Sequence, residues 1–356
     1  MFLSLLLIRA LLACAADPPA APTAPIAAPA EPVAAPAPTP AEPPHAPIHA
    51  DLHLDTPTQL YRKDVPLDHP TALEGGLPQL LAAHTNLAVE VLWPPKPEGG
   101  NSHANMLLDR LLAEIDRLEL VELARSPAEA RRIADAGHIA VVVSMEGAHG
   151  LGEDWRADLS RLRARGLSLL GLTWSFSNRF GGSSGDQGGG LSEDGRALVS
   201  LARAEGILLD VSHASRATTL ELCRDSAMPL IASHSDAAAV TPAARNLTDE
   251  EILCVAKTGG VIGLNLHSAF VGGGADVRAI ADHADHIAQV GGYGAVALGS
   301  DFDGLIRVPK DITDASKLEL LWAELARRGW TADQIAGARG ENFMRAWEGA
   351  VAAAKR

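Results

Sequence analysis

The run IAVVVSMEG at residues 139–147 is apolar along most of its length and ends beside an acidic residue, Glu146. A short apolar run that is rich in β-branched residues is typical of a strand buried in a parallel sheet. Helical patterns precede and follow this run, and the same alternation continues in both directions along the chain. The pattern indicates consecutive βα units, which favours an α/β fold.

Eight runs of this kind follow one another along the chain. They span residues 48–55, 86–93, 139–147, 169–174, 207–213, 230–235, 261–266 and 296–302. Three of the predicted helices begin with a capping-box pattern, at residues 126–129, 248–251 and 331–334. Eight strands that alternate with helices predict a (β/α)8 TIM-like barrel.

The overall composition fits one such domain. The chain has 356 residues, of which 47% are hydrophobic, and this is ample for a single large core. The formal net charge is -14 at pH 7, and no run rich in Lys and Arg occurs. An acidic protein does not attract nucleic-acid phosphates, so we exclude nucleic acid as a partner.

The N-terminal segment predicts export. Residues 1–16 have the apolar character of a signal peptide, and the stretch LLAC at residues 11–14 is similar to a bacterial lipoprotein processing site. Cys14 would then carry lipid and anchor the protein to a membrane of the cell envelope. The alternative is an ordinary signal peptide cut near Ala15 or Ala16, which would give a periplasmic or secreted protein.

Residues 17–47 are almost entirely Ala, Pro, Glu and Thr, a composition that cannot form a packed core and predicts a disordered, semi-rigid spacer. The folded domain is therefore expected over residues 48–356. Within it, Cys223 and Cys254 lie in predicted helices, where we expect them to be small buried hydrophobes with no disulfide framework.

Residues that suit a metal ion lie at the carboxyl ends of five predicted strands. In such barrels the reactive groups project from these ends into one mouth. His53 and Asp55 are two positions apart, so their side chains point the same way. Imidazole nitrogens and carboxylate oxygens suit zinc, and the carboxylate of Glu146 could bridge two ions. The residues of this set are His53, Asp55, Glu146, His213, His234 and, after the last strand, Asp301.

The folded part resembles the membrane (renal) dipeptidase family of zinc peptidases, from about His49 to Trp347. The motifs that carry the resemblance are HLD at 53–55, MEG at 145–147, DVSH at 210–213, SHS at 233–235, RN at 245–246, GSDFDG at 299–304 and ENF at 341–343. The resemblance implies a barrel of the metal-dependent hydrolase type that cleaves dipeptides.

The resemblance also implies two zinc ions per chain. His53 and Asp55 would hold one ion, His213 and His234 the other, and Glu146 would bridge them. A hydroxide between the ions would attack the scissile carbonyl. Family members further suggest a homodimer.

Two more roles follow from the resemblance. Asp301 would shuttle the proton from the attacking water to the leaving amine. Arg245, followed by Asn246, would bind the substrate's carboxylate. A guanidinium pairs well with a free carboxylate one residue beyond the cut bond, which would restrict the substrate to dipeptides.

One position departs from the family pattern. The family usually has a histidine after Leu-Thr at the end of the fourth strand, whereas this sequence has Trp174. Trp donates one hydrogen bond but cannot carry a charge. Trp174 would therefore either lack a contact to the developing oxyanion or shape a pocket for a bulky, apolar substrate side chain.

Two other functions stay open at this point. The same barrel could hydrolyse a lactam, a lactone or an N-acyl amino acid, because the fold does not determine the substrate. A surface-anchored binding protein with impaired catalysis is the second alternative. The pair His283 and His286, spaced H-x-x-H, lies mid-helix before the last strand, where we expect a structural or solvated role far from the mouth.

Overall fold

The computed structural model describes residues 45–96, 99–224 and 227–354. Cys14, the predicted signal peptide and most of the predicted spacer lie outside the described residues. His45 to Arg356 form one compact unit. Among the residues described, no helix has both the length and the apolar character needed to cross a bilayer.

Eight parallel strands form the barrel wall, and each lies within or beside one of the predicted runs. They are β1 Ala50–Leu54, β2 Leu87–Leu92, β4 Ile139–Glu146, β5 Leu167–Gly171, β6 Leu208–Asp210, β7 Leu230–Ala232, β8 Val261–Leu264 and β9 Val296–Leu298. Each strand pairs with the next in this order. One further strand, β3 Val121–Leu123, lies outside this order. It pairs with the start of β4 and was not predicted.

The first and last barrel strands meet just beyond their regular hydrogen bonding. Leu54 forms an isolated parallel bridge with Phe302, and the Asp55 N–H donates to the Phe302 carbonyl at 2.9 Å. The Asp301 N–H likewise donates to the His53 carbonyl at 3.0 Å. The nearly closed barrel thus brings the residues after β9 beside those at the end of β1.

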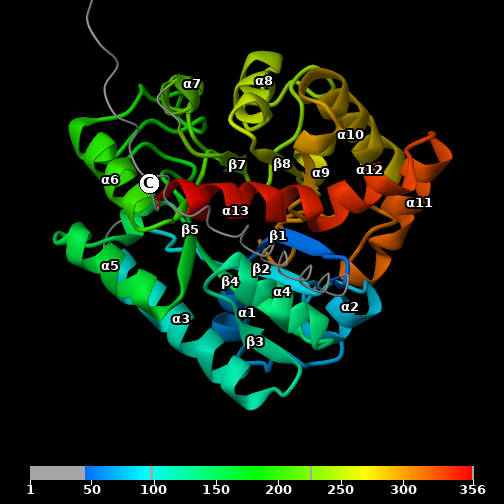
Figure 1. Ribbon diagram of the computed structural model, residues 1–356, viewed down its shortest axis with the longest axis horizontal. Helices are drawn as coiled ribbons and strands as arrows, with labels where there is room; N and C mark the ends of the chain where they lie inside the picture. Colours follow the sequence, from blue (N-terminus) through cyan, green and yellow to red (C-terminus); the bar gives the residue numbers. More distant parts are fainter. Residues whose placement is uncertain (1–44, 97–98, 225–226, 355–356) are drawn as a thin grey trace, which may run out of the picture. The chain divides into compact units, whose positions relative to one another are not determined.

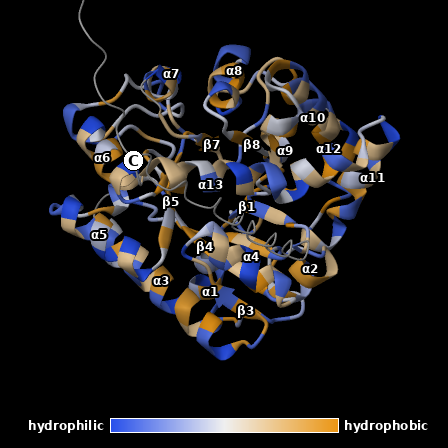
Figure 2. Ribbon diagram, in the orientation of Figure 1, coloured by the Kyte–Doolittle hydropathy of each residue, from blue (hydrophilic) through white to orange (hydrophobic). Residues whose placement is uncertain are grey.

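Helices surround the strands (Figure 1). They are α1 Thr56–Lys63, α2 Leu77–Ala82, α3 Gly100–Arg117, α4 Pro127–Asp135, α5 Trp155–Arg165, α6 Glu193–Ala204, α7 Arg216–Arg224, α8 Asp249–Lys257, α9 Ser268–Val271, α10 Val277–Gly291, α11 Glu319–Arg327, α12 Ala332–Ala336 and α13 Asn342–Ala354. Capping boxes begin α8 and α12, as predicted, and the Ser126 side chain caps α4. Polar and apolar residues are interspersed along the outer helices (Figure 2), which lets each helix bury one face and solvate the other.

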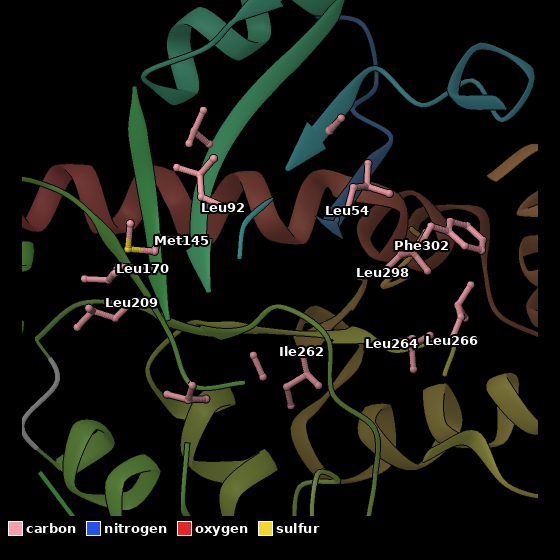
Figure 3. Packing of buried hydrophobic residues seen from close by; sticks show 14 of the residues in the cluster. Leu54, Leu92, Met145, Leu170, Leu209, Ile262, Leu264, Leu266, Leu298 and Phe302 are labelled. Carbon is pink, nitrogen blue, oxygen red and sulfur yellow. The ribbon is translucent and has the colours of Figure 1, made fainter. Parts of the chain in front are cut away.

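Two clusters of buried apolar side chains hold the barrel together. One gathers side chains from all eight barrel strands with Phe343 and Trp347 of α13, so α13 covers one end of the barrel interior. The other lies between the strands and the outer helices. In Figure 3, Leu92, Met145 and Leu170 belong to this second layer, and the strand register pairs them as direct neighbours.

A disulfide joins α7 to α8, contrary to the sequence-based expectation. The sulfurs of Cys223 and Cys254 are 2.09 Å apart, and the two Cα atoms are separated by 5.9 Å. The expectation of two free, buried thiols was therefore wrong. The two cysteines are 31 positions apart, so the sequence alone does not show that they are neighbours. Only the packing of consecutive outer helices brings them within bonding distance.

Candidate metal centre and substrate cleft

Three histidine rings converge on one carboxylate at the mouth of the barrel. Glu146 is the last residue of β4, while His213 and His234 follow β6 and β7. The Oε1 atom of Glu146 lies 2.8 Å from His213 Nε2, 3.3 Å from His234 Nε2 and 3.6 Å from His53 Nε2. The four side chains are almost completely buried. The barrel therefore brings together ligand-type groups from four strands around Glu146.

The remaining predicted ligands adjoin this cluster. The Oδ2 atom of Asp55 lies 3.9 Å from His53 Nε2. Candidate ligand atoms of His53, Asp55 and Asp301 all lie within 4.8 Å of one another, as do those of His53, Glu146 and His234. The structure thus shows two overlapping groups of three that share His53. The assignment of individual ligands to individual ions stays a prediction.

A hydroxyl group behind the cluster orients two of the rings. Ser233 Oγ donates to Asp210 Oδ2 at 2.5 Å, and it lies 3.1 Å from His53 Nδ1 and 2.8 Å from His234 Nδ1. Because both rings direct Nε2 toward Glu146, their Nδ1–H groups are the donors to Ser233. A metal-binding histidine is commonly held in this way through its other nitrogen. The sequence motifs contain Ser233 and Asp210 but did not reveal this role.

The electrostatics of the cluster fit zinc. Burial, reinforced by Arg245, lowers the pKa of His53 to about 3, and burial also lowers the pKa values of His213 and His234 well below their usual range. All three imidazoles are therefore neutral, as metal ligation requires. Burial, followed by repulsion from neighbouring carboxylates such as that of Asp301, raises the pKa values of Glu146 and Asp55.

A dication at the centre would favour the ionised form of these carboxylates. It would also satisfy His53 Nε2 and Asp55 Oδ1, which are buried without a hydrogen-bond partner. Neutral imidazoles together with carboxylates are the donor set that zinc prefers. The residues present therefore fit a zinc centre.

Asp301 lies where its carboxyl group can face this centre. Burial raises the pKa of Asp301 to about 7. The Asn265 amide opposes this rise, because its Nδ2 donates a hydrogen bond of 3.1 Å to Asp301 Oδ2. The backbone φ of Asp301 is 65°, a left-handed conformation that costs a non-glycine residue free energy. Gly304 leaves space for it, since a Cβ there would lie 2.6 Å from Asp301 Oδ1 and 2.7 Å from Asp55 Oδ2.

A cleft of about 350 Å³ opens over the cluster. Its lining consists of Asp55, Trp93, Glu146, Trp174, Ser175, His213, Arg245, His267, Phe270, Asp301, Gly304, Leu305 and Ile306. The cleft thus has a polar floor of predicted ligands and a largely apolar wall. Trp93 and Phe270 were not predicted as site residues, because each belongs to an otherwise ordinary apolar strand end or loop.

Trp174 belongs to the aromatic part of this wall. Its ring packs edge-on against the ring of Trp93 with 5.1 Å between centroids, and its centroid lies 6.3 Å from that of His213. The side chain is half-buried. The position that usually carries a histidine in the family therefore presents an apolar surface beside a predicted metal ligand.

Arg245 also lines the cleft. Its Nη2 donates to the carbonyl of His234 at 3.2 Å, and its Cζ lies 5.7 Å from the centroid of the Phe270 ring. The Nε–H is buried and has no hydrogen-bond partner. Arg245 therefore lines the cleft as a cation, with one buried donor that no group of the protein satisfies.

The neighbouring Asn246 has a different environment. Its Nδ2 donates to the carbonyls of Thr241 and Phe270, at 2.8 and 2.9 Å. It lines a second cavity of about 340 Å³ that adjoins the first and shares His213 and Arg245 with it. The predicted contact of Asn246 with substrate stays a prediction, while its hydrogen bonds hold two loops together.

Comparisons with known proteins agree with this architecture. The chain is 34% identical over 216 residues to the dipeptidase aclJ of Aspergillus oryzae, an alignment that covers 59% of this chain and 51% of that protein. It is also 34% identical over 230 residues to an uncharacterised Klebsiella pneumoniae protein encoded in the pqqA 5' region, covering 60% of this chain and 83% of that protein.

Two solved structures superpose with a TM-score of 0.79 over 85% of this chain and 99% of theirs. One is described as the dipeptidase AC, a metallopeptidase of family M19, and is 28% identical. The other, 27% identical, is a metallopeptidase from Rhodobacter sphaeroides liganded with a phosphinate mimic of the dipeptide L-Ala-D-Ala. The sequence model of the family described as membrane dipeptidase (peptidase family M19) matches residues 45–356, and we conclude that this chain belongs to that family.

Proposed function

We propose that this chain is a binuclear zinc dipeptidase whose ions are held by the cluster around Glu146. Metal-dependent hydrolysis of dipeptides is the activity of its family. The observation that carries the proposal for this chain is the convergence of His53, His213 and His234 on Glu146, with Asp55 beside them. Zinc, when bound, supplies a Lewis acid that polarises the scissile carbonyl and makes water more acidic.

Asp301 moves the proton in this proposal. Its carboxylate takes a proton from the attacking water and delivers it to the nitrogen of the leaving amino acid. A pKa raised to about 7 by burial suits both steps near neutral pH. The Asn265 amide orients the carboxylate by donating to Oδ2, which leaves Oδ1 free to meet the water.

Arg245 binds the carboxylate of the substrate in this proposal. It is half-buried and lines the cleft, so its guanidinium can pair with an anion bound there. A dipeptide places its carboxylate one residue beyond the cut bond, whereas a longer peptide has a neutral amide there. Recognition of that charge would therefore select dipeptides by length.

The wall formed by Trp93 and Trp174 favours an apolar side chain on the substrate. Two indole rings packed edge-on offer contact area but only N–H donors, so a charged side chain would lose hydration there without compensation. The same wall keeps a second candidate open, namely hydrolysis of an N-acyl amino acid or a cyclic amide with apolar substituents.

A double-mutant cycle tests the carboxylate contact. Arg245→Met should reduce kcat/KM for free dipeptides by about 2–4 kcal/mol, the range for losing a charge-assisted contact in a partly buried cleft. Amidating the C-terminus of the substrate should cause a similar loss in the unmutated enzyme and little further loss in the variant. Arg216→Met is the matched control, since Arg216 lines the adjoining cavity but pairs with Glu250.

The metal proposal has its own measurement. Purified protein that begins near His45 should contain close to two zinc ions per chain and lose activity to chelators. One ion or fewer in fully active protein would contradict a bridging Glu146. If Arg245→Met and amidation of the substrate reduce kcat/KM additively while the zinc content stays the same, hydrolysis of uncharged or cyclic substrates would be favoured instead.

We also propose that the protein is exported and attached to a membrane through lipid on Cys14. The proposal rests on the LLAC pattern at residues 11–14. Changing Cys14→Ser should release the protein from the membrane fraction or block its maturation. Unchanged membrane association would leave export but remove the lipid anchor. A homodimer likewise stays a prediction, to be tested by the molecular mass in solution.

A further inference from the structure

Two loops form the side of the cleft that carries Arg245. The first is the loop 233–248 between β7 and α8, which bears Arg245 itself. The second follows β8 and includes the short helix α9, with Phe270 near its end. Arg245 reaches over the Phe270 ring, with 5.7 Å between Cζ and the ring centroid. The position of the guanidinium therefore depends on how these two loops lie against each other.

Side chains within the loops already tie them together. Asn246 Nδ2 donates to the Phe270 carbonyl at 2.9 Å, and Thr241 Oγ1 donates to the Val271 carbonyl at 2.9 Å. Both bonds run from the Arg245 loop to the backbone of α9. These contacts hold the loops to each other. The start of the Arg245 loop is also joined to β8, because the Ser235 N–H donates to the Gly263 carbonyl at 2.6 Å.

A histidine on the outer layer of the barrel joins both loops to a third element. His283 lies on α10, is fully buried, and uses both ring nitrogens. Its Nδ1 accepts a hydrogen bond of 3.1 Å from the N–H of Ala237, in the Arg245 loop. Its Nε2–H donates a hydrogen bond of 3.0 Å to the carbonyl of Val271, at the end of α9. One imidazole therefore bridges both loops to a helix that packs on the barrel.

The two bonds require one protonation state. Nδ1 must carry a lone pair for Ala237, and Nε2 must carry the proton for Val271, so the ring has to be the neutral Nε2–H tautomer. Burial lowers the pKa of His283 below its ordinary value, which keeps the ring neutral near pH 7. A residue that merely filled space would not need a donor on one edge and an acceptor on the other.

We infer that His283 is a positioning residue for substrate recognition, which sets the place of Arg245 by joining its loop and α9 to α10. The inference rests on the proposed role of Arg245 as the carboxylate receptor. His283 itself is remote from the reacting atoms, since it contacts loop backbone and no predicted metal ligand. Its loss should therefore change recognition of the carboxylate and leave the metal centre intact.

The test compares two replacements of His283 on a pair of substrates. His283→Leu keeps the ring's apolar volume but removes both hydrogen bonds, whereas His283→Gln retains one donor and one acceptor. We expect His283→Leu to raise KM for a free dipeptide such as Leu-Ala by about 10–100-fold, the range for misplacing a substrate contact. The kcat/KM for the corresponding dipeptide amide should change little, and His283→Gln should recover part of the loss.

Two further measurements separate positioning from general damage. Zinc content should stay unchanged in both variants, and amide hydrogen exchange should accelerate at Ala237 in His283→Leu. His286→Leu is the matched control: His286 lies on the same helix but pairs with the half-exposed carboxylate of Asp249. It should leave the KM values for both substrates unchanged.

Each outcome bears on the inference. Equal losses on the free dipeptide and its amide, or loss of zinc from His283→Leu, would overturn a role that acts through Arg245. Should His283→Leu fail to fold, the same comparison applies to His283→Gln, where an unaltered KM and unaltered Ala237 exchange would also overturn it. If the unmutated protein hydrolyses no dipeptide at all, the proposed function fails, while Ala237 exchange still tests whether His283 holds the loop.

Discussion

The floor of the cleft and its Arg245 side are built in different ways. Glu146 is the last residue of a strand, and the three histidines lie within a strand or at most three positions beyond one. Their placement follows directly from the packing of the barrel. Arg245 lies near the end of the loop 233–248, which is held by hydrogen bonds between side chains and backbone. If the floor binds metal and Arg245 binds the substrate carboxylate, as we propose, the two functions should be separable by mutation.

The largest effect should come from the floor. Glu146→Gln removes the negative charge on which three imidazoles converge, so we expect kcat/KM to fall by at least about 1000-fold, the upper range for one lost electrostatic contact. Zinc content, measured on the purified variant, should fall as well. Glu122→Gln, which removes a charge from a surface ion pair on β3, is the control. It should change neither kcat/KM nor the zinc content. Full zinc content with Glu146→Gln would show that the charge is not needed to hold metal.

The disulfide tests whether the recognition side depends on outer helices. Cys223→Ala with Cys254→Ala opens a covalent loop of 31 positions, and the chain-entropy relation gives a loss of about 3–4 kcal/mol in the free energy of unfolding. Urea unfolding of the oxidised and the double-mutant proteins measures it. The folded variant should keep its zinc and its KM. A rise in KM without loss of zinc would show that the α7–α8 bridge also positions the loops above it.

The hydroxyl behind the histidines should matter for metal alone. Ser233→Ala removes the common hydrogen-bond partner of His53 and His234, and we expect zinc affinity to weaken by about 10–100-fold. Competition with a chelator of known affinity measures this change, and Ser200→Ala on the exposed face of α6 is the control. Once saturated with zinc, the variant should keep its preference for free dipeptides over their amides. Loss of that preference would show that the Ser233 hydroxyl also affects recognition of the substrate carboxylate.

The smallest effect is expected at the aromatic wall. Trp174→His replaces an apolar surface with a polar ring, so kcat/KM for dipeptides with large apolar side chains should fall by about tenfold, with a smaller change for Gly-Gly. A panel of dipeptides that differ in one side chain measures it. A rise in kcat across the whole panel would mean instead that a histidine there supplies a transition-state contact that Trp174 lacks.

The barrel and the centre of its site could be predicted from the sequence. Eight short apolar runs have the period and length of buried parallel strands, and polar residues that follow such strands share one rim in this architecture. His53, Glu146 and His234 could therefore be placed together before any coordinates were considered. The strand β3, Val121–Leu123, was missed because Glu122 interrupts it and Glu119 precedes it, so this stretch lacks the continuous apolar run that marks a buried strand.

Other features depended on contacts between segments distant in sequence. Cys223 and Cys254 become partners because α7 packs on α8, and the loops of Arg245 and Phe270 meet only once the barrel strands have assembled. His283, interpreted from sequence as remote from the mouth, reaches two mouth loops from the outer layer. Periodicity along a chain reports which face of an element is buried, and so it determined the strands and their ends. The partner of a buried polar atom is set by three-dimensional packing, which only the tertiary structure decided.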